Sequence, residues 1–269
     1  MSIWVPDRTI LEPSLAVPHM RPQGNIKIDW TNYFARGLRL AVMSGPVVTG
    51  KSFLRDITGK NTVKESSGIS ASRVLMTRYR NYWNTIFNDS SDEVQYQRCK
   101  AIEPNNITVL VRAYVLDTGG QYVCLVTKDY TSYGSPWYSY HLRLNTSGNN
   151  AQFYVGGSST VAVNAPTDSY LPHFSNVRWT AGTYNGSKVA IQTFYDSGAM
   201  DSNAGASSSF SLGAIQYYDT DLHFGDTHSS TTNRSFWGSL FDVFIWDHGK
   251  SMIELSNFIR NPYQIYTPA

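Results

Sequence analysis

The sequence predicts an all-β protein in which two antiparallel sheets pack together as a jelly-roll sandwich. From Leu38 onward, short apolar or alternating runs are separated by clusters of Gly, Asn, Asp and Ser, the pattern of strands and turns. The 269 residues include 18 Tyr and 7 Trp, enough large rings to fill the space between two sheets. Strands and helices do not alternate along the chain, so no parallel sheet is expected.

The strand signals extend through most of the chain. Asn185-Gly186 and the segment 147–150 (SGNN) accept the positive φ of tight hairpin turns, so the runs that flank each of them are expected to pair antiparallel. The clearest strand-like runs are 74–79, 108–115, 122–127, 137–144, 151–155, 177–183, 188–194 and 236–246.

Three segments depart from the strand pattern. Residues 1–25 are rich in proline and predict an extended arm, with Trp4, Ile10 and Leu11 as its apolar anchors, and residues 26–269 are expected to form one domain. The small, polar segment 196–211 predicts a mobile loop. Near the end, Ser251 and Glu254 have the spacing of a capping box, which predicts one short helix packed on the sheet.

Composition excludes several classes of partner. The net charge is +2 and the basic residues are scattered, so no nucleic acid is expected to bind. No apolar run approaches the length of about 18 residues that a membrane span needs, and the N-terminus lacks the pattern of a signal peptide, so we expect a protein made and kept in a cytoplasm. Cys99 and Cys124 lie in strand-like runs and are expected to be free thiols, with a disulfide bond as the alternative.

The second half of the chain resembles the concanavalin-A-like, laminin-G-like sandwich family. Residues 179–187 (WTAGTYNGS) are similar to its W-x-x-x-x-T-Y-D-G-S hairpin, and residues 222–225 (LHFG) to its strand ending in Gly. Residues 236–246 (FWGSLFDVFIW) resemble its F-x-G-x-[IL]-D-x-[IV]-x-[IV]-[WY] strand, the more specific match. The resemblance implies a concanavalin-A-like sandwich.

Three further segments resemble members of this family from tailed bacteriophages. The ending 260–268 (RNPYQIYTP) is similar to their closing N-P-W-Q-[IL]-F-x-P, the segment 28–38 (IDWTNYFARGL) to their opening D-W-x-N-P-L-x-x-G-L, and 56–61 (DITGKN) to a D-x-[ST]-G-x-x-N string. The resemblance implies a structural protein of the virion, in the capsid decoration or in the tail and its fibres. It also implies other virion proteins as partners and a homo-oligomer on the particle.

One motif points elsewhere. Residues 45–52 (GPVVTGKS) match the P-loop pattern G-x-x-x-x-G-K-[ST] in full. A phosphate-binding P-loop must open a helix, yet Thr58-Gly59 interrupts the chain within about two turns. We therefore expect no nucleotide and no cofactor.

A calcium site is one interpretation of three aspartates in the second half of the chain. Asp219, Asp221 and Asp226 surround a short strand-like run, and loops rich in oxygen ligands are where Ca²⁺ binds. The same residues are common turn formers, which is the preferred interpretation. The six histidines are dispersed, without the spacing of a zinc site.

Aromatic residues in loop-like positions are the candidate contact residues, because their flat faces stack on sugar rings and also pack against proteins. No paired-carboxylate E-x-D-x-x-E string and no G-x-S-x-G is present, so we expect no enzyme. The alternatives are a carbohydrate-binding module for host surface glycans and, third, a polysaccharide hydrolase. The candidate residues are Tyr130, Tyr133, Trp137, Tyr138, Tyr217 and Tyr218.

Overall fold

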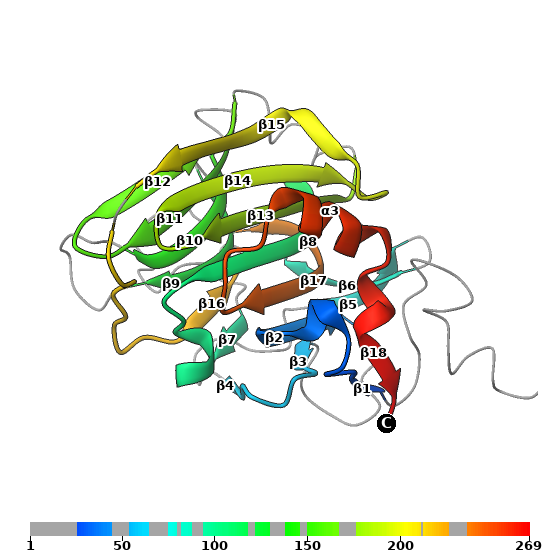
Figure 1. Ribbon diagram of the computed structural model, residues 1–269. Helices are drawn as coiled ribbons and strands as arrows, with labels where there is room; N and C mark the ends of the chain where they lie inside the picture. Colours follow the sequence, from blue (N-terminus) through cyan, green and yellow to red (C-terminus); the bar gives the residue numbers. More distant parts are fainter. Residues whose placement is uncertain are drawn as a thin grey trace, which may run out of the picture.

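A computed structural model of the chain contains two large antiparallel sheets and a single α-helix among the described residues (Figure 1). All strand pairs in the described residues are antiparallel, which confirms the predicted all-β sandwich. The structure describes residues 26–44, 54–64, 75–79, 82–87, 94–117, 122–129, 138–145, 150–166, 176–210, 212–225 and 236–269.

The larger sheet carries most of the recognised sequence motifs. Its strands, from one edge, are β15 (Met200–Ser209), β14 (Lys188–Tyr195), β13 (Arg178–Tyr184), β8 (Ile107–Asp117), β17 (Trp237–Trp246), β2 (Leu38–Ser44) and β3 (Leu54–Asp56). In addition to β8 and β2, β17 pairs with β6 (Tyr82–Phe87), and β6 in turn pairs with β5 (Leu75–Tyr79).

The smaller sheet faces the larger one. Its order is β12 (Thr160–Asn164), β11 (Asn150–Gly156), β10 (Tyr138–Asn145), β9 (Tyr122–Asp129), β16 (Leu222–Phe224), β7 (Val94–Tyr96) and β4 (Val63–Lys64). A separate ribbon joins the start of the described chain to its end, because β1 (Ile26–Ile28) pairs with β18 (Tyr266–Pro268). Each of the predicted strand-like runs coincides with a strand.

A single hydrophobic core fills the space between the two sheets. It combines β8 residues such as Val109 and Val111 with Leu142 and Phe153 from the opposite sheet. Gly182 of β13 lies against the Phe153 ring, where a Cβ atom would overlap it. Glycine is therefore required for this contact between the sheets.

A second core covers the outer face of the larger sheet. There α3 (Met252–Arg260) and the short helices η1 (Tyr33–Ala35) and η4 (Pro262–Ile265) pack over the stacked rings of Phe244 and Trp246, and Phe258 of α3 meets both rings edge-on. The predicted capping box is present, since the Ser251 side chain accepts from Glu254 N while the Glu254 carboxylate accepts from Ser251 N. The predicted helix is thus confirmed, together with its position on the sheet.

Local turn chemistry also follows the sequence. Asn185 and Gly186, whose φ is +93°, join β13 to β14, and the Asn185 side chain accepts from the backbone N–H groups of Ser187 and Lys188. The predicted hairpin is confirmed. In the described residues both cysteines are free thiols, and Cys99 precedes the short helix η2 (Lys100–Ile102) rather than lying in a strand.

The expected mobile loop at 196–211 is wrong. Residues 200–209 form β15, an edge strand that pairs with β14. Small side chains supply little buried surface, but the strand is held by its backbone hydrogen bonds to a neighbour that is itself anchored in the core. The amino-acid composition of the segment gives no indication of these backbone hydrogen bonds.

The P-loop-like segment connects two antiparallel strands. Residues 45–53 lie outside the described residues, and the strand that follows them, β3, pairs antiparallel with β2. Phosphate binding would need a helix after the loop, whereas the next described residues, Leu54–Asp56, form a strand. In the described parts of the chain, no helix has the length and apolar character to cross a membrane.

Candidate functional site

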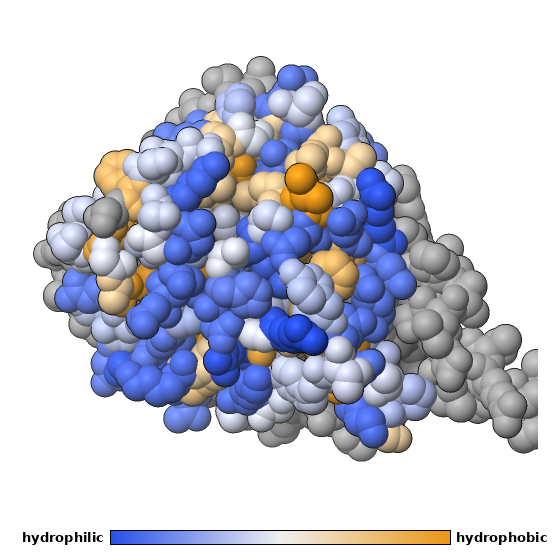
Figure 2. Space-filling view, viewed as in Figure 1, coloured by the Kyte–Doolittle hydropathy of each residue, from blue (hydrophilic) through white to orange (hydrophobic). Residues whose placement is uncertain are grey.

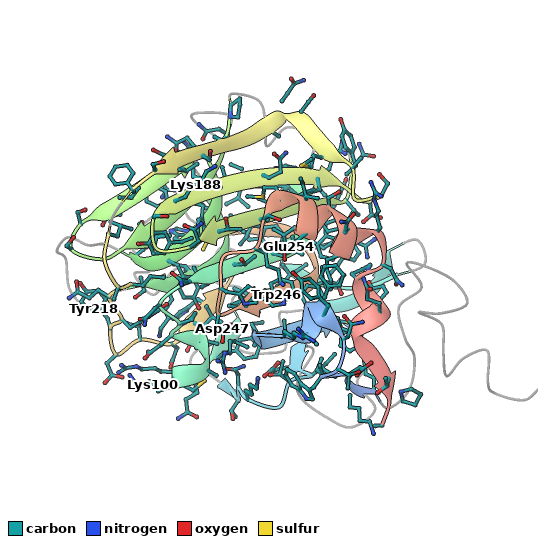
Figure 3. The ribbon with its side chains drawn as sticks, viewed as in Figure 1. Lys100, Lys188, Tyr218, Trp246, Asp247 and Glu254 are labelled. Carbon is teal, nitrogen blue, oxygen red and sulfur yellow. The ribbon has the colours of Figure 1, made fainter. Side chains whose placement is uncertain are left out.

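A surface pocket of about 530 Å³ lies at the edge of the larger sheet where β17 ends and its neighbours β2 and β8 begin. Its volume falls in the range of small-molecule sites. In Figure 3, Lys100 and Asp247 lie below Trp246 on the side that faces the viewer, and Figure 2 shows mostly hydrophilic surface there. The lining residues are Arg39, Lys100, Ala101, Glu103, Pro104, Asn105, Asn106 and Asp247.

Strand register brings these residues together. Trp246 at the end of β17 is opposite both Leu38 of β2 and Thr108 of β8, so the residues just beyond these positions meet. The Thr108 hydroxyl donates to His248 O over 2.7 Å and accepts from Lys250 N over 2.8 Å. These bonds fix the turn that carries Asp247 against the start of β8.

An ion pair forms one wall of the pocket. Arg39 Nε donates to Asp247 Oδ2 over 2.8 Å, and Nη2 of the same guanidinium contacts that oxygen as well. Burial raises the pKa of Asp247, but hydrogen bonds from His248 and Arg39 outweigh burial and hold it below its ordinary value. Asp247 is therefore ionised at neutral pH.

Glu103 on the opposite side is held in the same way. It accepts from Arg98 Nε over 2.6 Å and lies 3.4 Å from the buried Lys128 Nζ. Burial raises the pKa of Glu103, yet the Arg98 hydrogen bond and the charge of Lys128 lower it overall. A glycosidase acid needs a carboxyl with a raised pKa. Neither of these two carboxylates has that property.

An exposed aromatic ring flanks this region. Trp30 is 48% exposed, and Lys60 Nζ lies 4.3 Å from the centroid of its ring. The same ammonium donates to Leu38 O over 2.9 Å, and burial together with the charge of Arg39 lowers its pKa. Lys60 thus connects the Trp30 ring with the Arg39 wall. Paired charges, side-chain amides and a flat ring together suit a ligand rich in hydroxyl groups.

A second polar cluster lies on the outer face of the smaller sheet, and its members are nearly fully buried except for Tyr154, which is half-buried. Arg143 Nε donates to Gln152 Oε1 over 2.8 Å and Arg143 Nη2 donates to the Tyr154 hydroxyl over 2.6 Å. The His141 and Tyr138 rings are 4.5 Å apart. Because its side chains are buried, this cluster presents less accessible surface to a ligand than the pocket does.

The structure separates the predicted contact residues. Tyr138 lies in the buried cluster on the smaller sheet, whereas the Tyr217 hydroxyl donates to Pro104 O over 2.6 Å and so supports the pocket wall from behind. Tyr218 is half-buried nearby. The other predicted contacts and arm anchors lie outside the described residues, namely Tyr130, Tyr133, Trp137, Trp4, Ile10 and Leu11.

The predicted calcium ligands face an arginine. Asp219 Oδ1 accepts from Arg98 Nη1 over 2.7 Å, and Asp221 Oδ1 accepts from Arg98 N over 3.0 Å. Asp226 lies outside the described residues. Within the described ranges, no group of three or more His, Cys, Asp or Glu residues could hold a metal ion.

Sequence reasoning missed the pocket itself. Arg39, Glu103 and Asp247 belong to no motif and are far apart along the chain. The only sequence signal was indirect, since Asp247 directly follows the recognised strand motif that ends at Trp246.

Comparison with known proteins supports the fold. No protein-family model and no curated protein matches the sequence. The binding domain of Paraclostridial Mosquitocidal Protein 1 matches with a TM-score of 0.60 and 12% identity, over 85% of this chain and 53% of that domain. The binding domain of botulinum neurotoxin serotype G matches with a TM-score of 0.58 and 12% identity, over 84% and 51%.

A Trypanosoma rangeli sialidase in complex with sialic acid matches with a TM-score of 0.56 and 11% identity, over 86% of this chain and 34% of the sialidase. The chain thus spans about half of the length of each of the two binding domains and 34% of the length of the sialidase. At this identity the likeness establishes the fold, a β-sandwich of the kind found in these binding domains.

Proposed function

We propose that this protein is a binding domain that holds a glycan in the pocket between Arg39, Asn106 and Asp247. The pocket carries the proposal, because it is open, of ligand size, and lined by donors and acceptors in fixed positions. Support also comes from the fold, which is shared with two domains described as binding domains and with a sialidase that is bound to sialic acid.

Binding without catalysis fits the electrostatics of the site. Glu103 and Asp247 are both engaged by arginine and have lowered pKa values, so both are ionised and neither is a proton donor. Of the two, Asp247 is the acceptor that a ligand can reach, since its side chain is 26% exposed and that of Glu103 is 2% exposed. Hydrolysis of a glycosidic bond would require one of the two to be protonated at neutral pH.

The proposed setting is the particle of a tailed bacteriophage, as a capsid decoration or as part of the tail and its fibres. The support is the resemblance of the segments 28–38, 56–61 and 260–268 to phage members of the sandwich family. On this proposal the N-terminal arm docks on another virion protein through Trp4, Ile10 and Leu11, since a proline-rich segment loses little entropy on binding.

A glycan array followed by calorimetry tests the pocket. Asn105→Ala and Lys100→Ala change lining residues at exposed positions, and each should weaken binding of the best glycan about tenfold, the effect of one hydrogen bond. Asn257→Ala, on the exposed side of α3, is the matched control and should bind normally. Absence of any glycan binding, or equal affinity in all four proteins, would refute the assignment.

Deletion of residues 1–25 tests the proposed place in the phage particle independently of the pocket. The truncated protein should unfold at the same temperature as the full chain and fail to enter phage particles. Incorporation at the normal level would contradict the proposed role of the arm and leave the pocket proposal unaffected.

A further inference from the structure

The edge strand β15 offers an unguarded stretch of backbone. It is the last strand at one end of the larger sheet, at the top of Figure 1, and no described strand pairs with its outer edge. Exposed sheet edges invite pairing with another chain, and proteins usually protect them with charged residues, proline or a bulge. Only the first half of β15 has such protection.

That protection is a bulge. The pairing of β14 with β15 is irregular between Gln192 and Phe194, and the Gln192 side chain fills the gap by donating to Asp201 O over 2.7 Å. Residues 205–209 instead follow a regular ladder. Residues 202–210 contain no charged residue and no proline, so this half of the edge lacks the usual protection.

The direction of the free hydrogen-bonding groups follows from one bond. Phe210 N donates to Ser187 O, on the side of β14. Since the N–H groups of alternate residues point to the same side of a strand, those of Gly205, Ser207 and Ser209 point outward. They form a regular row of donors along the unprotected half.

Exposed apolar side chains gather at the two ends of the same strand. Met200 begins β15 and is 45% exposed, Phe210 follows it and is 44% exposed, and Tyr195 at the end of β14 is 41% exposed. These are three of the six large hydrophobic side chains that are exposed in the described residues. Figure 2 shows hydrophobic surface near both ends of this strand.

We propose that two copies of this protein associate by antiparallel pairing of their β15 strands around Ser207. In this register Ser207 of one copy lies opposite Ser207 of the other. Gly205 of each copy then lies opposite Ser209 of its partner, and Phe210 opposite Ala204. The outward groups of residues 205, 207 and 209 then pair with one another, and small side chains let the strands approach closely. No charge meets a like charge, so the strand is complementary to itself, as a two-fold interface requires.

Light scattering and sedimentation of the full chain test the proposal. At rising concentration the mass should approach twice the 30.2 kDa of one chain. Ser207→Pro removes an outward N–H while sparing the bonds to β14, since proline is tolerated on the free side of an edge strand. This variant should stay monomeric, and at concentrations where the wild type is also monomeric the two should unfold at the same temperature. Ile253→Ser, which removes an exposed apolar side chain from α3, is the control and should dimerise normally.

A second variant and a local measurement complete the test. Ser207→Lys keeps the N–H but places two like charges at the symmetry axis, so it should be monomeric as well. It replaces the proline variant as the test if that variant fails to fold. Amide exchange at Gly205, Ser207 and Ser209 should slow as the dimer forms. A chain that stays monomeric at every concentration, a dimer insensitive to both Ser207 substitutions, or a monomer in which these amides are already protected would each overturn the proposal.

Discussion

Arg112 of β8 and Asp242 of β17 lie directly opposite each other and are both buried, with 3.5 Å between Nη1 and Oδ2. The Tyr263 hydroxyl donates to the same carboxylate oxygen over 3.2 Å. Arg112 also pairs with Asp196 at the end of β14. The pair therefore joins the centre of the larger sheet to the C-terminal segment that covers it.

Asp242→Asn should destabilise the protein by about 3 kcal/mol, because it leaves the buried Arg112 with less opposing charge. Urea unfolding measures the loss. Asp219→Asn removes a largely exposed partner of Arg98 and should change the free energy of unfolding by no more than about 0.5 kcal/mol. Equal effects of the two substitutions would contradict the buried network.

Gly182→Ala should cost about 1 to 3 kcal/mol, because the new Cβ overlaps the Phe153 ring across the two sheets. Combining it with Phe153→Leu should cost less than the sum of the two single changes, since the smaller side chain makes room. Additive losses in thermal or urea unfolding would show that the two residues do not meet.

The stability of the protein should fall below about pH 4.5 in part through Glu254. Burial raises its pKa, but the Tyr33 hydroxyl, Ser251 and Lys250 outweigh burial and bring it to about 2. A carboxyl with a lowered pKa in the folded state stabilises above its unfolded pKa and loses that contribution as pH falls toward the folded value.

Glu254→Gln isolates this contribution, because glutamine can still complete the capping box. The wild type should have the higher unfolding temperature at pH 6, and the difference should shrink as pH falls from about 4.5 to about 2. A difference that is constant with pH would contradict the lowered pKa.

Calcium should leave the unfolding temperature unchanged, and so should a chelator. Asp219 and Asp221 are already bonded to Arg98, whose charge would repel a cation there. A calcium-dependent rise in the unfolding temperature that Asp221→Asn abolishes would restore the metal site as an explanation for these aspartates.

The features that depend on nearby residues were predictable. The Asn185-Gly186 hairpin and the Ser251–Glu254 capping box need only a few consecutive positions, and both occur where the sequence placed them. β15 was missed because its small residues carry no strand signal, and its pairing with β14 lies outside its own composition.

The pocket could not be predicted in the same way. Its walls come from Arg39, from the segment around Glu103 and from Asp247, and no local pattern relates these positions. Register between β2, β8 and β17 brings them together. The predicted contact Tyr217 turned out to support the wall, because its hydroxyl faces Pro104.

The sequence by itself determined the class of fold, since alternation, turn residues and helix caps act over a few neighbouring positions. Only the tertiary structure decided which charged side chains meet in the pocket and which edge of the sheet stays open. Those outcomes depend on strand order and register, which are set by packing between residues far apart in the chain.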